Sequence, residues 1–330
     1  MRHVDARASN SRRNAIAHRE RLPGTLAGAV QKSPYHLPIR QVGIMTDPKD
    51  IAPDSTAARV ALWRALHLEL DATPHILADN VGLKLLEPPD DWRERGDMNP
   101  AFTRPFRASI VARARFIEDL VLAQMREGVT QYVILGAGLD SFAQRHPELA
   151  TSLTIFEVDR PGPQRWKHDR LIALGYGVQD WLHFVPVDFE AGQSWRDALL
   201  QHGFDAARPA VIVSTGVSMY LTREANASTL REVSSFAPGS TLAMTFLLPL
   251  EMADPEVRPG LEMAEKGARA SGTPFISFFT PEEMMTFARE NGFRHAEHVS
   301  AAALTERYFA HRDDGLRPPS NAEELLIATT

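Results

Sequence analysis

The part of the chain that most constrains its fold is a short apolar run, residues 132–135, which ends in Gly136-Ala137-Gly138. Four more apolar runs of strand length follow, at residues 153–158, 182–187, 210–213 and 241–248. Helical patterns lie between them, at residues 165–174, 195–201 and 223–236. Strands that alternate with helices are typical of a parallel sheet with helices on both faces. The sequence therefore predicts an α/β fold with a doubly wound, Rossmann-like sheet.

The segments around this core predict a cap and a lid. Helical patterns at 54–70 and 80–86 form an N-terminal helical cap over residues 47–108, and the Pro-rich loop at 87–105 marks its boundary. A helix over 109–126 then opens the core, residues 109–330. An insertion at about 249–279 interrupts the core beyond the fifth strand, and we expect it to close over a ligand. A helix at 281–291 and apolar runs at 295–299 and 325–328 extend the sheet at one edge.

Charge and composition narrow the function classes. Residues 1–46 hold eight Lys or Arg against two acids, whereas the whole chain has a net charge of −6, so a basic, disordered leader precedes an acidic body. An acidic body disfavours a nucleic-acid partner, and no apolar run is long enough to span a membrane. The absence of cysteine excludes disulfides, thiolate metal sites and a cysteine nucleophile. A cytoplasmic protein is the expectation, and the sequence does not define its oligomeric state.

Acidic residues follow the first three strands. Glycines Gly136 and Gly138 after the first strand let a ligand approach the backbone, with Asp140 just beyond them. Asp159 ends the second strand 21 residues after Gly138, the spacing at which a carboxylate accepts hydrogen bonds from ribose hydroxyls. Asp188 follows the third strand, where it can accept from an adenine amino group beside the ring of Phe189. Each acid alone is typical of a solvated strand end, but the ordered series predicts an adenosine site.

The type of cofactor follows from what the motif lacks. Ser141 stands where the dinucleotide motif requires its third glycine, and no tyrosine is followed four residues later by lysine, as short-chain hydride-transfer enzymes require. Adenosine without a pyrophosphate clamp favours S-adenosylmethionine over a nicotinamide cofactor. No zinc-binding sequence motif is present, so we expect no metal site.

Four motifs together resemble one known family. They are residues 131–141, the segment Phe156-Glu157-Val158-Asp159-Arg160-Pro161, the segment Val187-Asp188-Phe189, and residues 216–222. In this order they resemble the leucine carboxyl methyltransferase superfamily, most closely its bacterial branch of S-adenosylmethionine-dependent and polyketide-synthesis O-methyltransferases. The resemblance covers about residues 54–330 and implies a class I methyltransferase fold.

The resemblance also implies roles for individual residues. Arg113 would hold the carboxylate of the cofactor's methionine moiety, and Tyr220 would lie near the transferable methyl group. Asp140 and Arg160 belong to the matched motifs, and we expect them to be cofactor-binding residues. Thr215 is counted with the cofactor site but stands where the family usually has glutamate. The resemblance therefore implies either a weaker contact with the cofactor's amino group or a changed pocket at this position.

The expected function is O-methylation of a carboxyl or hydroxyl group on a small molecule, such as a secondary metabolite. No catalytic base is evident, and Phe275, Phe278 and Phe279 of the insertion are candidates for the acceptor pocket. Three alternatives remain open. They are a catalytically impaired cofactor-binding homologue, because of Thr215; a serine hydrolase that uses Ser218 in Gly216-Val217-Ser218-Met219-Tyr220; and a nucleic-acid methyltransferase, favoured by the basic leader alone.

Overall fold

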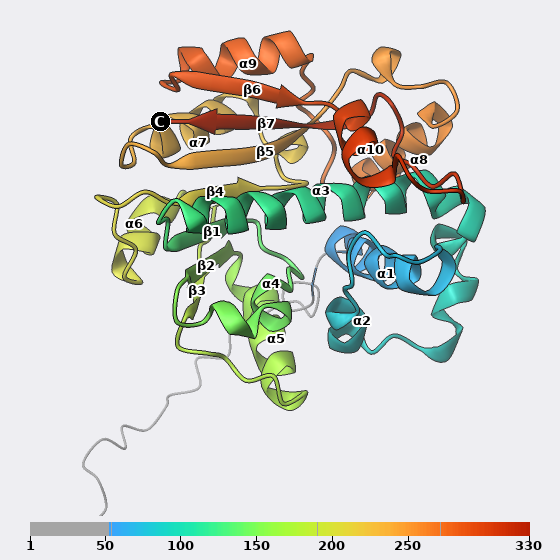
Figure 1. The fold of residues 1–330 in the computed structure, drawn as a ribbon, viewed down its shortest axis with the longest axis horizontal. Helices are drawn as coiled ribbons and strands as arrows, with labels where there is room; N and C mark the ends of the chain where they lie inside the picture. Colours follow the sequence, from blue (N-terminus) through green and yellow to red (C-terminus); the bar gives the residue numbers. More distant parts are fainter. Residues whose placement is uncertain (1–52, 54, 190, 271) are drawn as a thin grey trace, which may run out of the picture. The chain divides into compact units, whose positions relative to one another are not determined.

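A computed structural model describes residue 53 and residues 55–189, 191–270 and 272–330 (Figure 1). The predicted basic leader at 1–46 lies outside the described residues. The described chain forms a seven-stranded sheet in the order β3-β2-β1-β4-β5-β7-β6. The prediction of an α/β, doubly wound sheet is confirmed.

The strands are β1 (Gln131–Leu135), β2 (Thr154–Asp159), β3 (Leu182–Pro186), β4 (Val211–Ser214), β5 (Thr241–Leu247), β6 (His295–Val299) and β7 (Glu323–Thr329). Strands β1 to β5 are parallel, and β7 lies antiparallel between β5 and β6. The chain order reverses between β1 and β4. In open α/β sheets, ligands bind beyond the carboxyl ends of the strands at such a reversal.

The helices are α1 (Ser55–Leu70), α2 (Val81–Leu86), α3 (Pro100–Arg126), α4 (Phe142–Arg145), α5 (Pro161–Ala173), α6 (Trp195–Gln201), α7 (Arg223–Ser234), α8 (Arg258–Ala270), α9 (Pro281–Glu290) and α10 (Ala301–Phe309). Short 3₁₀ turns are η2 (Asp90–Glu94), η3 (Gly96–Met98), η4 (Pro147–Leu149), η5 (Ser218–Tyr220) and η6 (Leu250–Met252).

Alternation along the strands divides the core between the two faces of the sheet. On β1, Val133 and Leu135 pack with α6, α7 and α9, whereas Tyr132 and Ile134 pack with α3, α4 and α10. All five residues of β1 are buried, because a central parallel strand is covered on both faces. This rigid core holds the carboxyl ends of β1, β2 and β4 in place.

Helix α3 begins earlier than predicted. The expected helix over 109–126 extends back to Pro100, so the predicted cap–core boundary at 108 falls inside it. The side chain of Asn99 accepts hydrogen bonds from the backbone N–H groups of Ala101 and Phe102, at 3.1 and 3.0 Å. Asn at the N-cap followed by proline is a strong start signal. Pro105, in the second turn, gives this stretch the composition of a loop, which is why the sequence pattern does not predict the first turns of α3.

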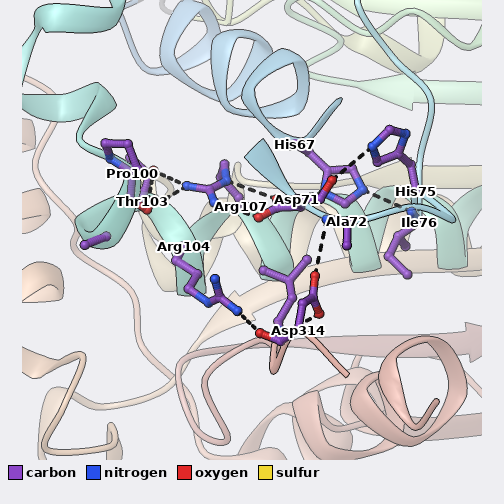
Figure 2. Close-up of polar contacts among 12 residues, drawn as sticks. His67, Asp71, Ala72, His75, Ile76, Pro100, Thr103, Arg104, Arg107 and Asp314 are labelled. Carbon is purple, nitrogen blue, oxygen red and sulfur yellow. Dashed lines mark hydrogen bonds and ion pairs between the residues drawn. The ribbon is translucent and has the colours of Figure 1, made fainter. Parts of the chain in front are cut away.

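A buried ionic cluster fastens the end of α1 to α3 (Figure 2). Arg107 Nη2 lies 2.8 Å from Asp71 Oδ1, and His67 Nδ1 lies 2.9 Å from Asp71 Oδ2. His67 Nε2 accepts from the backbone N–H of Ile76 at 3.0 Å, so Nδ1 carries the proton of a neutral imidazole. Burial alone would raise the pKa of Asp71, but hydrogen bonds from His67 and Arg107 hold it below its usual value. The cluster therefore fixes where α1 lies beside α3.

Among the described residues, no helix is both long enough and apolar enough to cross a membrane.

Candidate functional site

A cavity of about 990 Å³ opens at the carboxyl ends of β1, β2 and β4. Its other walls come from α1, the first half of α3, the start of β7, and α8 with the segment that follows it. The volume lies at the upper end of the range for small-molecule pockets, roughly 300–1,000 Å³. The cavity therefore lies where the strand order places a ligand, and it has room for a nucleoside together with a second small molecule.

The turn after β1 requires its glycines. Gly136 has a φ of +71°, and a Cβ there would come within 2.6 Å of Val217 Cγ2. Gly138 has a φ of +50°, and a Cβ there would lie 3.3 Å from Ala57 Cβ. The left-handed backbone and the close neighbours mean that any residue larger than glycine would be strained at these two positions. The turn thus presents bare backbone to the cavity.

Asp159 is fixed at the end of β2 by two backbone amides. Its Oδ2 accepts a hydrogen bond from the N–H of Gly138, and its Oδ1 accepts from the N–H of Arg160 at 2.7 Å. Each carboxylate oxygen has two lone pairs, so capacity to accept from a ligand remains. The carboxylate is half-buried in the cavity wall.

Arg113 and Thr215 lie at the opposite side of the glycine turn. Arg113 Nη1 is 2.5 Å from Glu323 Oε1, and both side chains belong to the cavity wall. Thr215 follows β4, and the N–H of the next residue, Gly216, donates to Thr245 Oγ1 at 2.8 Å. Arg113 thus lies in the cavity wall with an acidic partner that the sequence did not indicate.

Eight of the ten residues predicted for the site line this cavity. They are Arg113, Gly136, Gly138, Asp140, Asp159, Arg160, Thr215 and Tyr220. The remaining two, Asp188 and Phe189, do not line it. Asp188 Oδ1 accepts from the N–H of Ala191 at 3.0 Å, and the ring of Phe189 is 45% exposed. The adenine-binding role assigned to these two stays a prediction.

The cavity wall away from the strand ends is aromatic. Trp63 of α1 stacks on Phe106 of α3 at 5.7 Å between ring centroids, and Phe102 packs on Phe106 at 5.4 Å. Tyr220 meets Phe275 edge to face at 5.3 Å. The sequence does not assign these residues to the site. Trp63 belongs to the apolar face of the predicted helix at 54–70, where its sequence position does not distinguish a cavity residue from a core residue. Phe102 and Phe106 lie in or beside the stretch predicted as a loop, and their apolar i, i+4 spacing after Asn99-Pro100 was the available signal for a helix.

The insertion after β5 covers this aromatic wall. Leu261, Met263 and Ala264 of α8 line the cavity, although α8 has no buried residue. The N–H of Ile276 donates to the carbonyl of Met219 at 2.8 Å, which ties the insertion to η5. Of the three candidate phenylalanines, Phe275 lines the cavity, Phe278 lines a small neighbouring one, and Phe279 packs in the core beside Phe287.

Charge in the cavity wall is balanced. Among its described residues are four arginines and four acids, namely Arg59, Arg64, Arg113, Arg160, Asp97, Asp140, Asp159 and Glu323. Behind the wall, Glu157 of β2 is buried against Lys167 of α5. Burial raises the pKa of Glu157 to about 7 although Lys167 lowers it. Glu157 belongs to the packing beneath Asp159 rather than to the cavity.

Ser218 is not arranged as a nucleophile. Its side chain is 1% exposed, and its hydroxyl donates to the carbonyl of Thr245 at 2.7 Å. It lies in the 3₁₀ turn η5 and does not line the cavity, so the hydrolase alternative is not supported. No group of three or more His, Asp or Glu residues in the described part of the chain could hold a metal ion.

Residues 57–234 match the family described as leucine carboxyl methyltransferase. The chain is also 37% identical over 207 residues to a Bacillus subtilis protein named "Putative S-adenosyl-L-methionine-dependent methyltransferase YktD", a match that covers 62% of this chain and 67% of the relative. The chain belongs to the leucine carboxyl methyltransferase family. It is an S-adenosylmethionine-dependent methyltransferase, as the resemblance in its motifs implies.

Other relatives of this methyltransferase agree. A Mycobacterium tuberculosis protein that bears the same description is 36% identical over 165 residues, which are 49% of this chain and 53% of the relative. The match to this relative thus spans about half of its length. Two solved structures share the fold. A DUF574 family protein from Streptomyces avermitilis has a TM-score of 0.54 at 16% identity, covering 85% of this chain and 99% of that chain. A Thermobifida fusca protein described as "a putative methyltransferase" has a TM-score of 0.52 at 19% identity, covering 87% of this chain and 99% of that chain.

The cavity of this methyltransferase fits its cofactor. The turn at Gly136 and Gly138 offers bare backbone, Asp159 offers a fixed carboxylate for ribose hydroxyls, and Arg113 offers a guanidinium for the methionine carboxylate. These three features lie around one cavity, whose aromatic wall lies away from the strand ends.

Proposed function

We propose that this methyltransferase transfers its methyl group to an oxygen of a small hydrophobic molecule, a carboxylate in preference to a hydroxyl. A secondary metabolite with an aromatic or extended apolar body fits this description. The observation that carries the proposal is the aromatic wall of Trp63, Phe102 and Phe106, which shares one cavity with the glycine turn and Asp159.

The absence of a base among the described cavity residues supports a carboxylate acceptor. The described cavity residues include no histidine, and each of the four acids already pairs with a group of the protein: Asp97 with Arg95, Asp140 with the amide of Phe142, Asp159 with the amide of Arg160, and Glu323 with Arg113. A phenol or an alcohol must lose its proton to react at neutral pH, whereas a carboxylic acid is already ionised. The wall therefore suits an acceptor that needs no proton removed.

S-adenosylmethionine supplies an electrophilic methyl group on a sulfonium, so the protein's main task is alignment and exclusion of water. Asp159 and the glycine turn hold the nucleoside end. The rings of Tyr220 and Phe275 restrict the space beside η5, where the acceptor oxygen would be aligned. Helix α8 closes the aromatic compartment, so that bulk water does not compete with the acceptor.

Incubation with S-[methyl-³H]adenosylmethionine and a panel of aromatic and fatty acids, phenols and alcohols tests the proposal. Esters release labelled methanol on treatment with base, whereas ethers do not. We expect base-labile label on one or more apolar acids. Label confined to base-stable products would contradict the carboxylate preference, and the absence of label on every oxygen acceptor would contradict O-methylation.

A further inference from the structure

The ion pair between Arg113 and Glu323 joins two distant parts of the chain inside the cavity. Arg113 lies in the middle of α3 and Glu323 begins β7, 210 residues later. Their side chains are 14% and 12% exposed, so water only partly screens them. Arg113 Nη2 also lies 3.5 Å from the position of a Cβ on Gly216, directly after β4. The pair therefore lies beside the reversal point of the sheet.

The methionine end of the cofactor carries two opposite charges on one carbon, an α-carboxylate and an α-ammonium. A guanidinium alone would pair the carboxylate and leave the ammonium without a partner in a partly desolvated wall, which is costly. Thr215, the residue beside Gly216, is neutral and cannot balance that charge. An acid next to Arg113 is needed, and Glu323 is the acid that contacts it.

The other acids of the wall already accept from their own surroundings. Asp159 accepts from the amides of Gly138 and Arg160, and Asp140 accepts from the amide of Phe142 at 2.8 Å. Asp97 pairs with Arg95. Glu323 differs from them because its partner, Arg113, is itself a group expected to bind the cofactor.

We propose that Arg113 and Glu323 together form the receptor for the amino-acid end of the cofactor, with Glu323 binding the α-ammonium in place of the carboxylate that Thr215 lacks. The inference rests on the cofactor site of the proposed function and is independent of the acceptor. Binding replaces the ion pair between Arg113 and Glu323 by two ion pairs with the ligand. The two side chains together and the amino-acid end of the cofactor each have a net charge of zero, so binding leaves no unbalanced charge. Thr215 is then compatible with an active enzyme.

Calorimetry with three ligands and no acceptor tests the receptor. The ligands are S-adenosylhomocysteine, its analogue without the amino group, and 5′-methylthioadenosine, which lacks the amino-acid end. For Glu323→Gln we expect affinity for S-adenosylhomocysteine to fall about 10- to 100-fold, the loss typical of a hydrogen bond to a charged group. Affinity for the desamino analogue should stay equal or rise, because Arg113 is released. Glu282→Gln, an exposed change in α9, should alter none of the three affinities.

Equal losses for S-adenosylhomocysteine and its desamino analogue, or no loss for either, would overturn the proposal, because Glu323 would then only orient Arg113 or do nothing. Binding of 5′-methylthioadenosine reports that the variant's nucleoside site is folded. If Glu323→Gln does not bind it, Glu323→Asp decides: a retained preference for the amino ligand supports the receptor, and a lost preference overturns it. Failure of the unmodified protein to bind S-adenosylhomocysteine would overturn the cofactor site itself, whereas failure to methylate acceptors would leave this result unchanged.

Discussion

The carboxylate of Asp159 accepts a hydrogen bond from the backbone N–H of Gly138, which ties the end of β2 to the glycine turn after β1. One side chain thereby orders two neighbouring strand ends and keeps an acceptor directed at the cavity. Because β1 and β2 are paired in parallel register, the two ends meet without any long side chain between them. This part of the cavity wall consequently presents backbone and one short carboxylate.

The buried cluster of Figure 2 predicts acid-sensitive stability. The pKa of Asp71 is lower in the folded chain than its ordinary value of 3.8. Its stabilising effect is therefore complete above that value and is lost as the pH falls through it toward the folded-state pKa. Asp71→Asn should cost about 3–5 kcal/mol at pH 7, because Arg107 would remain buried without its charged partner.

Urea unfolding of both proteins between pH 7 and pH 3 checks this prediction. The difference between them should shrink below about pH 4. The exposed change Asp180→Asn serves as the control and should leave the unfolding free energy within about 0.5 kcal/mol. A pH-independent difference would show that Asp71 is not charged in the cluster.

Ser218→Ala should leave methyl transfer within about twofold of the unmodified protein. The hydroxyl only bonds the carbonyl of Thr245, so its loss should cost about 1–2 kcal/mol of stability and nothing in the chemistry. Thermal unfolding and the tritium assay measure the two effects. Labelling of Ser218 by a fluorophosphonate probe would instead revive the hydrolase alternative.

Gly260→Ala should separate acceptor binding from cofactor binding. A Cβ at Gly260 would come within 2.7 Å of Phe106 Cζ, so α8 or the ring must shift. Overpacking of this kind costs about 1–3 kcal/mol, and we expect KM for the acceptor to rise roughly 5- to 150-fold while affinity for S-adenosylhomocysteine stays the same. The exposed change Glu282→Gln in α9, away from the cavity, is the control and should leave KM unchanged. An unchanged KM would show that α8 does not limit the acceptor compartment.

The sequence predicts the sheet and the glycine turn because both follow from local patterns. The runs at 295–299 and 325–328, predicted to extend the sheet at one edge, form β6 and the middle of β7. The position of Asp159 beside the glycine turn also follows from the strand order and from its spacing after Gly138. In each case the predictive pattern lies within one or two neighbouring strands.

Features that depend on contacts between distant segments were not predictable. Trp63 and Phe106 meet because α1 packs along α3, and Arg113 meets Glu323 across 210 residues. Asp188 and Phe189 follow β3, which forms the sheet edge two strands from β1. The regular order of the acids along the sequence does not bring the end of β3 to the cavity wall, because that wall is formed by the ends of β1, β2 and β4.

The affinity of Asp159→Ala for S-adenosylhomocysteine tests the cofactor site most directly. Calorimetry on the unmodified protein, on Asp159→Ala and on the exposed control Asp180→Ala gives the comparison, with urea unfolding to verify that each is folded. The account predicts an affinity about 10- to 100-fold weaker for Asp159→Ala, because the ribose hydroxyls lose their charged acceptor, and no change for Asp180→Ala. A folded Asp159→Ala protein with unchanged affinity would contradict it.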